Sequence, residues 1–211
     1  MTRRLPPLNP VAVPANEVPP VDLVRFATRN DHWLGEGFRP PPTHESWQAV
    51  LTDRTQRWYA IVDDSARSPG TEQPGDNCNS TVLGLVVFSR WIPPPWRSAE
   101  IGFAVDSRLT GQGLIQATVP RLLDAHLLAE LARIEALVDP SNVRAAQSLS
   151  RLGFKFEGYA RGCLDRQNER RTQAQWAIIT ADRVAARSPT DASANCRDAP
   201  LDKPIGGTGR D

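Results

Sequence analysis

The sequence predicts an α/β domain with a mixed β-sheet, and three observations lead to this prediction. Stretches rich in β-formers and stretches with helical spacing follow one another in the order β-β-β-α-β-α-β-β. A strand, a glycine pair and a helix lie in the middle of the chain. The last two β-rich runs face each other across "QNER", as in a closing hairpin. Helices interspersed with strands in this way are typical of a sheet covered by helices.

The N-terminal third is expected to hold one short strand, two helices and two longer strands. "RRLPPL" at 3–8 suggests an edge strand, and the run from 21 to 38 has helical apolar spacing at Val21 and Val24. A second helix should begin after Thr43, a good N-cap, with Glu45 in its first turn. "RWYAIVD" at 57–63 and "TVLGLVVFSR" at 81–90 are typical strands. Residues 64–80, which are polar and rich in Pro and Gly, predict a mobile loop.

The rest of the chain completes the sheet. Strands are expected at 99–105 and 133–139, with a helix at 114–132 between them that must accommodate Pro120. A short helix should follow, capped by Ser141 or Asn142 and ended by Gly153. The domain is then expected to cover 1–187. Residues 188–211 hold too few apolar side chains to offset the entropy of ordering, which predicts a disordered tail.

Composition excludes several classes of protein. The net charge is +1, with acids and bases interspersed, which argues against a nucleic-acid partner. The chain has no apolar run of about 18 residues and no signal-peptide pattern, so we expect neither a membrane partner nor export. Three widely spaced cysteines indicate reduced thiols and a cytoplasmic location. The three histidines, His32, His44 and His126, form no metal-spaced set, so we expect no metal and place each histidine on the surface.

The stretch "RLTGQGLI", residues 108–115, is the most specific signal. Glycines ahead of a helix let a phosphate approach the unpaired amides of its first turn, where the helix dipole is positive. The stretch is not a P-loop, because no Lys-Ser/Thr pair follows, and it lacks the third glycine of the dinucleotide fingerprint. It predicts a pyrophosphate cradle, with a simple turn as the alternative.

Both flanks of this stretch carry a family resemblance. Arg-x-x-Gly-x-Gly at 108–113, preceded by "AEIGFAV" and followed by "VDPSNVRAAQSLSRLGFKFEGYARG", resembles the GNAT superfamily of acyl-CoA-dependent N-acetyltransferases. Within that superfamily it is most similar to the subfamily of ribosomal-protein N-terminal acetyltransferases, over about residues 80–180. The resemblance implies a mostly antiparallel central sheet with helices on both faces, and a splayed pair of strands that admits acetyl-CoA.

The resemblance also implies which residues hold the cofactor. The pyrophosphate would lie on the main-chain amides of the cradle, and the strand ending at Phe103, Ala104 and Val105 would bind the pantetheine arm as an added strand does. Asn142 matches the family's asparagine beside that arm, although it also fits a helix N-cap. The cradle residues are Arg108, Leu109, Thr110, Gly111, Gln112, Gly113 and Leu114.

The catalytic assignments rest on fewer matches. Glu100 lies on the strand beside the cofactor, where many family members place a general base, and an ion pair with Arg90 or Arg97 is the alternative. The family's tyrosine acid falls on Leu149 here, and the serine that some relatives use falls on Ala145. The acid is then water or Tyr159, or it is unnecessary.

The acceptor cleft is expected between the N-terminal helices and the 91–97 loop. Trp33, Trp91 and Trp96 are the candidate acceptor-binding residues, with core packing as the alternative for each, while Trp47, Trp58 and Trp176 are assigned to the core. The sequence thus predicts an acetyl-CoA-dependent N-acetyltransferase, monomeric or homodimeric, that acts on a protein N-terminus, a lysine or a small amine or hydrazine. A non-catalytic acyl-CoA-binding regulatory module is the alternative.

Overall fold

The structure, a computed structural model, describes residues 8–32, 34, 38–64, 82–166 and 169–187. Seven strands within these residues form one sheet in the order β1-β2-β3-β4-β5-β7-β6. Neighbouring strands are antiparallel except β4 and β5, which are parallel. The strands are β1 (Pro10–Pro14), β2 (Arg57–Asp63), β3 (Val82–Ile92), β4 (Ser98–Val105), β5 (Arg133–Val138), β6 (Lys155–Arg166) and β7 (Glu169–Ile179).

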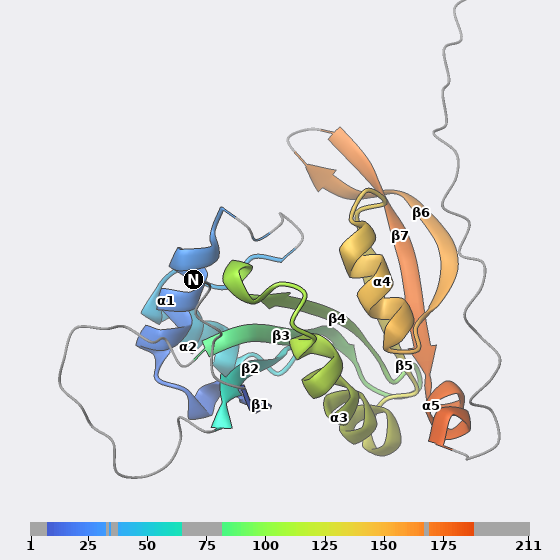
Figure 1. Ribbon diagram of the computed structural model, residues 1–211. Helices are drawn as coiled ribbons and strands as arrows, with labels where there is room; N and C mark the ends of the chain where they lie inside the picture. The colour runs from blue at the N-terminus through green and yellow to red at the C-terminus, as the bar shows by residue number, and fades with distance from the viewer. Residues whose placement is uncertain (1–7, 33, 35–37, 65–81, 167–168, 188–211) are drawn as a thin grey trace, which may run out of the picture.

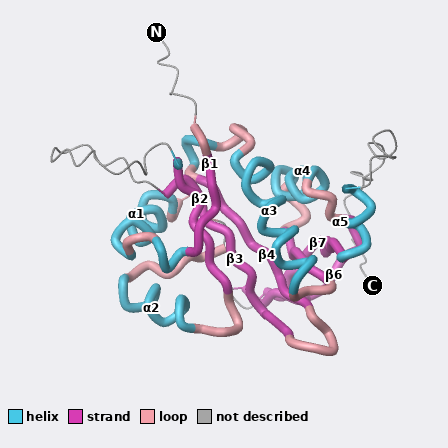
Figure 2. The backbone as a smooth tube through the Cα atoms, turned by 90° about the horizontal axis from the view of Figure 1, so that it is seen from below, coloured by secondary structure: helices cyan, strands magenta, loops and turns pink. Residues whose placement is uncertain are grey.

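The helices lie on both faces of this sheet (Figures 1 and 2). On one face, α1 (Pro20–Asn30) and α2 (His44–Thr52) pack over β1, β2 and β3. On the other face lie α3 (Leu114–Ala129) and α4 (Val143–Arg151). A short helix, α5 (Thr180–Arg187), follows β7 and contacts α3. The predicted mixed, mostly antiparallel sheet with helices on both faces is therefore confirmed.

Each face has its own apolar core. Phe26 of α1 and Trp47 of α2 are fully buried against Leu85 of β3. On the opposite face, Leu123 of α3 and Leu149 of α4 are fully buried in a core that runs from β2 to β7. Trp47 and Trp176 are buried as expected, and Trp58 packs at the margin of the α1–α2 core.

The predicted elements and the observed ones differ at both ends of the chain. The strand expected at 3–8 falls largely outside the described residues, and the first strand of the structure is Pro10–Pro14. The helix α5 was not predicted. The loop expected at 64–80 and the tail at 188–211 lie outside the described residues, apart from Asp64. No helix in the described part of the chain is long and apolar enough to cross a membrane.

Two residues of α3 have surroundings that were not predicted from the sequence. Pro120 lies inside a helix that runs without interruption from Leu114 to Ala129, and Arg183 of α5 donates a hydrogen bond to its carbonyl (3.2 Å). His126 is buried, with 6% of its surface exposed, so the prediction that it lies on the surface was wrong. Its Nε2 lies 2.8 Å from the Tyr59 hydroxyl, and its ring packs against Phe88 and Trp91.

Candidate active site

The sheet opens between its two parallel strands. β4 and β5 are paired at three positions, Ser98 with Arg133, Ala99 with Ile134 and Glu100 with Glu135. Beyond Glu100 the β4–β5 ladder ends, whereas β4 stays paired with β3 as far as Val105. The edge of β4 from Ile101 to Val105 therefore presents backbone groups with no strand beside them. This is the splayed pair that the sequence predicted.

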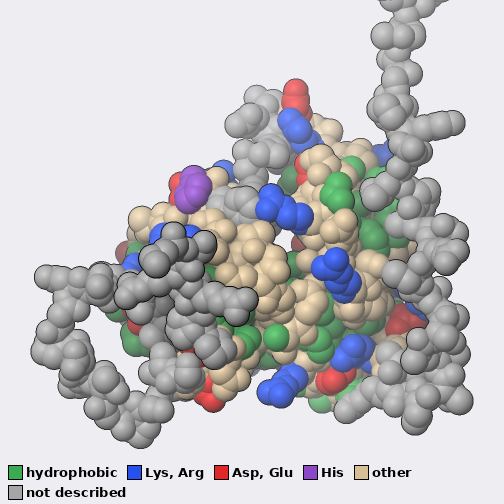
Figure 3. Space-filling view, viewed as in Figure 1, with side chains coloured by type: hydrophobic (Ala, Val, Ile, Leu, Met, Phe, Trp, Pro, Cys, Tyr) green, Lys and Arg blue, Asp and Glu red, His purple; other side chains and the backbone are tan. Residues whose placement is uncertain are grey.

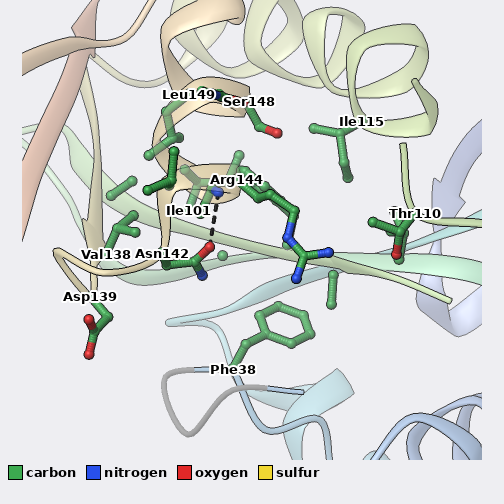
Figure 4. Close-up of a pocket in the computed structure, with 18 of the residues that line it drawn as sticks. Phe38, Ile101, Thr110, Ile115, Val138, Asp139, Asn142, Arg144, Ser148 and Leu149 are labelled. Atoms are coloured by element: carbon green, nitrogen blue, oxygen red, sulfur yellow. Dashed lines mark hydrogen bonds between the residues drawn. The ribbon is translucent and has the colours of Figure 1, made fainter. Parts of the chain in front are cut away.

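A pocket of about 830 Å³ occupies this opening. Its walls are β4, the turn before α3, the end of β5 and the first turns of α4, and Leu34 and Phe38 from the α1–α2 connection complete it. In the close-up, Phe38 lies across the pocket from Ser148 and Leu149 of α4 (Figure 4). The molecular surface is hollowed at this place, with basic side chains at the rim (Figure 3). The predicted strand residues Phe103, Ala104 and Val105 all line it.

The glycine turn forms one end of the pocket. Gly111 and Gly113 have φ of +81° and +76°, a region that side chains other than glycine rarely adopt. A Cβ built on either would meet no atom within 4 Å. Gly113 is the N-cap of α3, so the first amides of the helix open toward this space. The turn therefore combines free backbone donors with room for an anion.

Five of the seven predicted cradle residues line the pocket, namely Leu109, Thr110, Gly111, Gly113 and Leu114. Arg108 and Gln112 are not among the lining residues. The Arg108 side chain turns away and donates to both carboxylate oxygens of Asp106, from Nε and Nη2, each at 2.9 Å. Its backbone amide also donates to Asp106 (3.0 Å), so Arg108 is bonded to Asp106 and lies outside the pocket lining.

The opposite wall comes from the β5–α4 turn. Asn142 is the N-cap of α4, and its Oδ1 accepts a hydrogen bond from the Ala145 amide (3.1 Å), drawn as the dashed line in Figure 4. Its side-chain NH₂ remains available to the pocket, so the cap and a cofactor contact are compatible. Asp139 accepts from the Ser141 amide (2.9 Å) and hydroxyl (2.6 Å), which lowers the pKa of its carboxyl and stiffens the turn.

Glu100 lies where the splay begins. Its side chain is 26% exposed, lines the pocket and forms an ion pair with Arg90 (3.0 Å), one of the two partners considered from the sequence. Burial raises the pKa of the Glu100 carboxyl, the Arg90 charge lowers it, and Glu135 on the adjacent strand raises it. Burial has the largest effect, so the net direction is upward, as a general base requires.

The remaining predicted site residues lie outside the pocket or outside the described residues. Tyr159 is 60% exposed on β6 and packs on Phe156. Trp96 is 74% exposed, and Trp91 packs on His126 with the Arg57 guanidinium over its ring. None of these three lines the pocket. Trp33 is outside the described residues.

Among the pocket residues that were not predicted from the sequence are Arg144, Ser148 and Phe38, although Ser148 and Ser150 were considered as nearby hydroxyls that match no family position. Arg144 of α4 extends its guanidinium into the pocket, and the Ser148 hydroxyl faces the same space (Figure 4). Phe38 packs on β4 because Gly102 has no side chain, since a Cβ there would lie 3.0 Å from the ring. The signals were present for the α4 residues: Arg144 and Ser148 are one helical turn apart and follow Asn142. For Phe38 there was no local signal.

No group of three or more His, Cys, Asp or Glu side chains in the described ranges is arranged to hold a metal ion.

Comparison with known proteins shows the family to which the chain belongs. A family model described as an acetyltransferase (GNAT) domain matches residues 19–155, about two thirds of the chain. The chain therefore belongs to the GNAT acetyltransferase domain family, as the sequence motifs suggested.

Individual relatives agree with this class. The [ribosomal protein uS5]-alanine N-acetyltransferase of Escherichia coli is 27% identical over 107 residues, which are 50% of this chain and 55% of that protein. The chain thus spans about half the length of the curated relatives it matches. Among solved structures, a chimera of the Vibrio cholerae spermidine N-acetyltransferase SpeG and hSSAT superposes with a TM-score of 0.65 at 17% identity, covering 83% of this chain and 98% of the other. Mycobacterium smegmatis RimJ in complex with CoA-disulfide gives 0.61 at 23% identity, with 83% and 87% covered.

Proposed function

We propose that this protein is an acetyl-CoA-dependent N-acetyltransferase that moves an acetyl group to a primary amine. The observation that carries the proposal is the single pocket wall in which a glycine cradle, an unpaired strand edge and a half-buried carboxylate follow one another. These are the three requirements of the reaction: a place for the pyrophosphate, a track for the pantetheine arm and a base at its end.

The cradle and the strand edge suit acetyl-CoA. The space that a Cβ on Gly111 or Gly113 would enter is the space a phosphate would fill at the start of α3. The edge of β4 from Ile101 to Val105 offers alternating N–H and C=O groups to an extended arm with two amides. The Asn142 NH₂ faces the same arm from the other side. Bound acetyl-CoA supplies an activated thioester carbonyl.

Glu100 prepares the acceptor amine. An ammonium group entering beside Phe38 loses a proton to the Glu100 carboxylate, directly or through a water molecule, and the free amine attacks the carbonyl. The raised pKa of Glu100 makes it a better proton acceptor than an ordinary carboxylate. Ser148, whose hydroxyl faces the pocket, is better placed than Tyr159 to donate a hydrogen bond to the departing thiolate.

The acceptor class stays open within the primary amines. Protein N-termini, lysine side chains and small amines or hydrazines all present the required nitrogen, and relatives are named for a ribosomal-protein alanine and for spermidine. Phe38 and Glu100 line the same pocket, so an acceptor that reaches Glu100 shares this space with Phe38.

The test is thioester consumption with detection of free thiol, over a panel of peptides with N-terminal alanine, lysine peptides, spermidine and hydrazines. Turnover with any of them supports the enzyme. Binding of acetyl-CoA without turnover of any amine would instead support a non-catalytic acyl-CoA-binding regulatory module, for which Leu149 at the family's tyrosine position is the best argument.

The role of Glu100 has a matched control on the same face of the sheet. Glu100→Gln should lower kcat about 10²- to 10⁴-fold, with little change in the Kd for acetyl-CoA. Glu135→Gln, one strand away, should change kcat less than about threefold, because Glu135 acts on Glu100 only through space. An equal loss in both variants would contradict a base role for Glu100.

A further inference from the structure

The cofactor cradle is attached to α1 through one buried carboxylate. Asp106, directly after β4, is 1% exposed. Its Oδ2 accepts from Nε (2.8 Å) and pairs with Nη2 (2.7 Å) of Arg29. Its Oδ1 accepts from the backbone amide of Arg108 (3.0 Å), and both oxygens accept from the Arg108 guanidinium. Arginines from two elements thus meet on a single carboxylate.

The end of α1 makes a second attachment beside the first. Asn30 is fully buried, and its Oδ1 accepts a hydrogen bond from the Ser107 amide (3.0 Å). Its own NH₂ donates to the Phe26 carbonyl (3.0 Å), which fixes the orientation of the side chain. Arg29 also reaches the Val82 carbonyl (3.3 Å) at the start of β3. Two consecutive residues of α1 therefore hold two consecutive residues of the segment that leads into the cradle.

These polar groups act on the pocket only through the backbone. Asp106, Arg29 and Arg108 do not line it, but a chain of hydrogen bonds runs onward from Asp106. The Leu109 amide donates to the Asp106 carbonyl (2.8 Å), and the Gln112 amide donates to the Leu109 carbonyl (3.3 Å). The Thr110 hydroxyl donates to the Ser107 carbonyl (3.0 Å). The turn that carries Gly111 and Gly113 is built on this chain.

A buried ion pair is poor evidence for a stabilising role, because desolvation of the charges offsets much of their attraction. It does fix geometry, because a carboxylate that holds several donors has few other arrangements. Burial raises the pKa of Asp106, but the hydrogen bonds from Arg108 and the Arg29 charge outweigh it and bring the pKa to about 2. The carboxylate therefore stays ionised at any pH at which an amine acceptor is deprotonated.

We propose that Asp106, clamped by Arg29 and Arg108, is a positioning residue that holds the backbone amides of the 109–114 turn in place for the diphosphate of the cofactor. The proposal rests on the proposed function for the identity of the ligand. From its motif, Arg108 was expected to contact the cofactor directly. The proposal instead assigns the Arg108 side chain to Asp106. α1 itself ends at Asn30, and Leu34 and Phe38, which line the pocket, follow it in the sequence.

The experiment compares three variants with two substrates. Asp106→Asn removes the charge with little change in shape, and Arg108→Gln removes a donor that is 68% exposed, so the fold should persist. Arg25→Gln is the matched control, because Arg25 lies one turn earlier on α1 and pairs with Asp22 instead. KM is measured for acetyl-CoA and for S-acetylpantetheine, which has the thioester arm but no diphosphate. Hydrogen–deuterium exchange of residues 107–116 is measured in the ligand-free chain.

We expect the KM for acetyl-CoA to rise about tenfold or more in Asp106→Asn and about three- to tenfold in Arg108→Gln, since misplaced amides lose charge-assisted hydrogen bonds. The KM for S-acetylpantetheine should be unchanged, amide exchange in the turn should accelerate, and Arg25→Gln should match the wild type. An equal rise for both substrates, or unchanged exchange in the turn, would overturn the positioning role. If Asp106→Asn does not fold, Arg108→Gln decides between the same outcomes. A wild-type protein that neither binds nor consumes acetyl-CoA would overturn the proposed function instead, and the exchange measurement would still test the clamp.

Discussion

The ion pair between Arg90 and Glu100 leads to a prediction for the pH profile of kcat/KM, and the direction of the expected shift follows from the structure. Burial raises the pKa of Glu100, Arg90 lowers it, and Glu135 raises it. A base with a raised pKa is active when ionised, so kcat/KM should fall as the pH falls through that pKa. Arg90→Gln removes the lowering influence and should move the acid limb of the profile to higher pH. Glu135→Gln removes a raising influence and should move the limb to lower pH.

The size of the shift follows from distance and exposure. Two unit charges 3.0 Å apart attract by about 1.4 kcal/mol in a water-like dielectric, which corresponds to about one pH unit. Arg90 is 70% exposed, and exposed pairs typically contribute about 0.2–1 kcal/mol after screening. We therefore expect the Arg90→Gln limb to move up by about 0.2–0.7 pH units at low salt. The opposite movement in Glu135→Gln should be smaller, because Arg133 already pairs with Glu135 (2.6 Å).

The assay is kcat/KM for one acceptor amine across the pH range in the wild type and both variants, so that the titration of the amine is common to all three. Raising the salt concentration should shrink both shifts. If the two variants shift the limb in the same direction, or if neither moves it while the melting temperature changes, Glu100 is a structural partner and the base lies elsewhere.

Three further substitutions test single features of the site and core. Gly113→Ala should cost about 1–2 kcal/mol of stability because of its φ of +76°, and the affinity of the folded fraction for acetyl-CoA should fall as well. An unchanged affinity would show that Gly113 serves only to turn the chain. Asn142→Asp keeps an oxygen for the Ala145 amide but loses the NH₂ donor, so the melting temperature should hold while the KM for acetyl-CoA rises, and a drop in melting temperature alone would leave only the capping role. Burial lowers the pKa of His126, so the contribution of His126 to stability is present above a pH of about 6.5 and is lost as the pH falls through the lowered pKa. The melting temperature of His126→Leu should therefore depend less on pH between about 7 and 5 than that of the wild type. Equal slopes of melting temperature against pH would show that His126 does not titrate in this range.

The central elements could be predicted from sequence because their signals are local. "RWYAIVD" is rich in aromatic and β-branched residues between charged ends, and β2 has the predicted bounds, 57–63. Thr43 caps α2 through the Ser46 amide, as its place before the helix suggested. The cradle glycines were identifiable because their position after a strand and before a helix carries a physical requirement.

Other features depend on contacts between distant segments. α5 was missed because half of Thr180–Arg187 is polar and the helix is held by Arg183 contacts with Asp124 and Pro120 of α3. The burial of His126 could have been inferred from its position beside Leu122, Leu123 and Leu127, but its partner Tyr59 is 67 residues away. The clamp on Asp106 could not be inferred, since Arg29 is 77 residues from it.

The opening between β4 and β5 has a consequence for how the molecule moves. β4 and β5 are joined at three paired positions only, and a ladder as short as this would by itself allow the two halves of the sheet to hinge. The apolar core beneath it is continuous, however: Phe88 of β3, Ile101 of β4, Ile134 of β5 and Ile178 of β7 belong to one buried cluster with α3. Moving β4 away from β5 would expose side chains of that cluster to water, at a cost of the order of 1.5–3 kcal/mol for each large side chain exposed. The two halves of the sheet are therefore expected to unfold as one cooperative unit rather than to separate at this ladder.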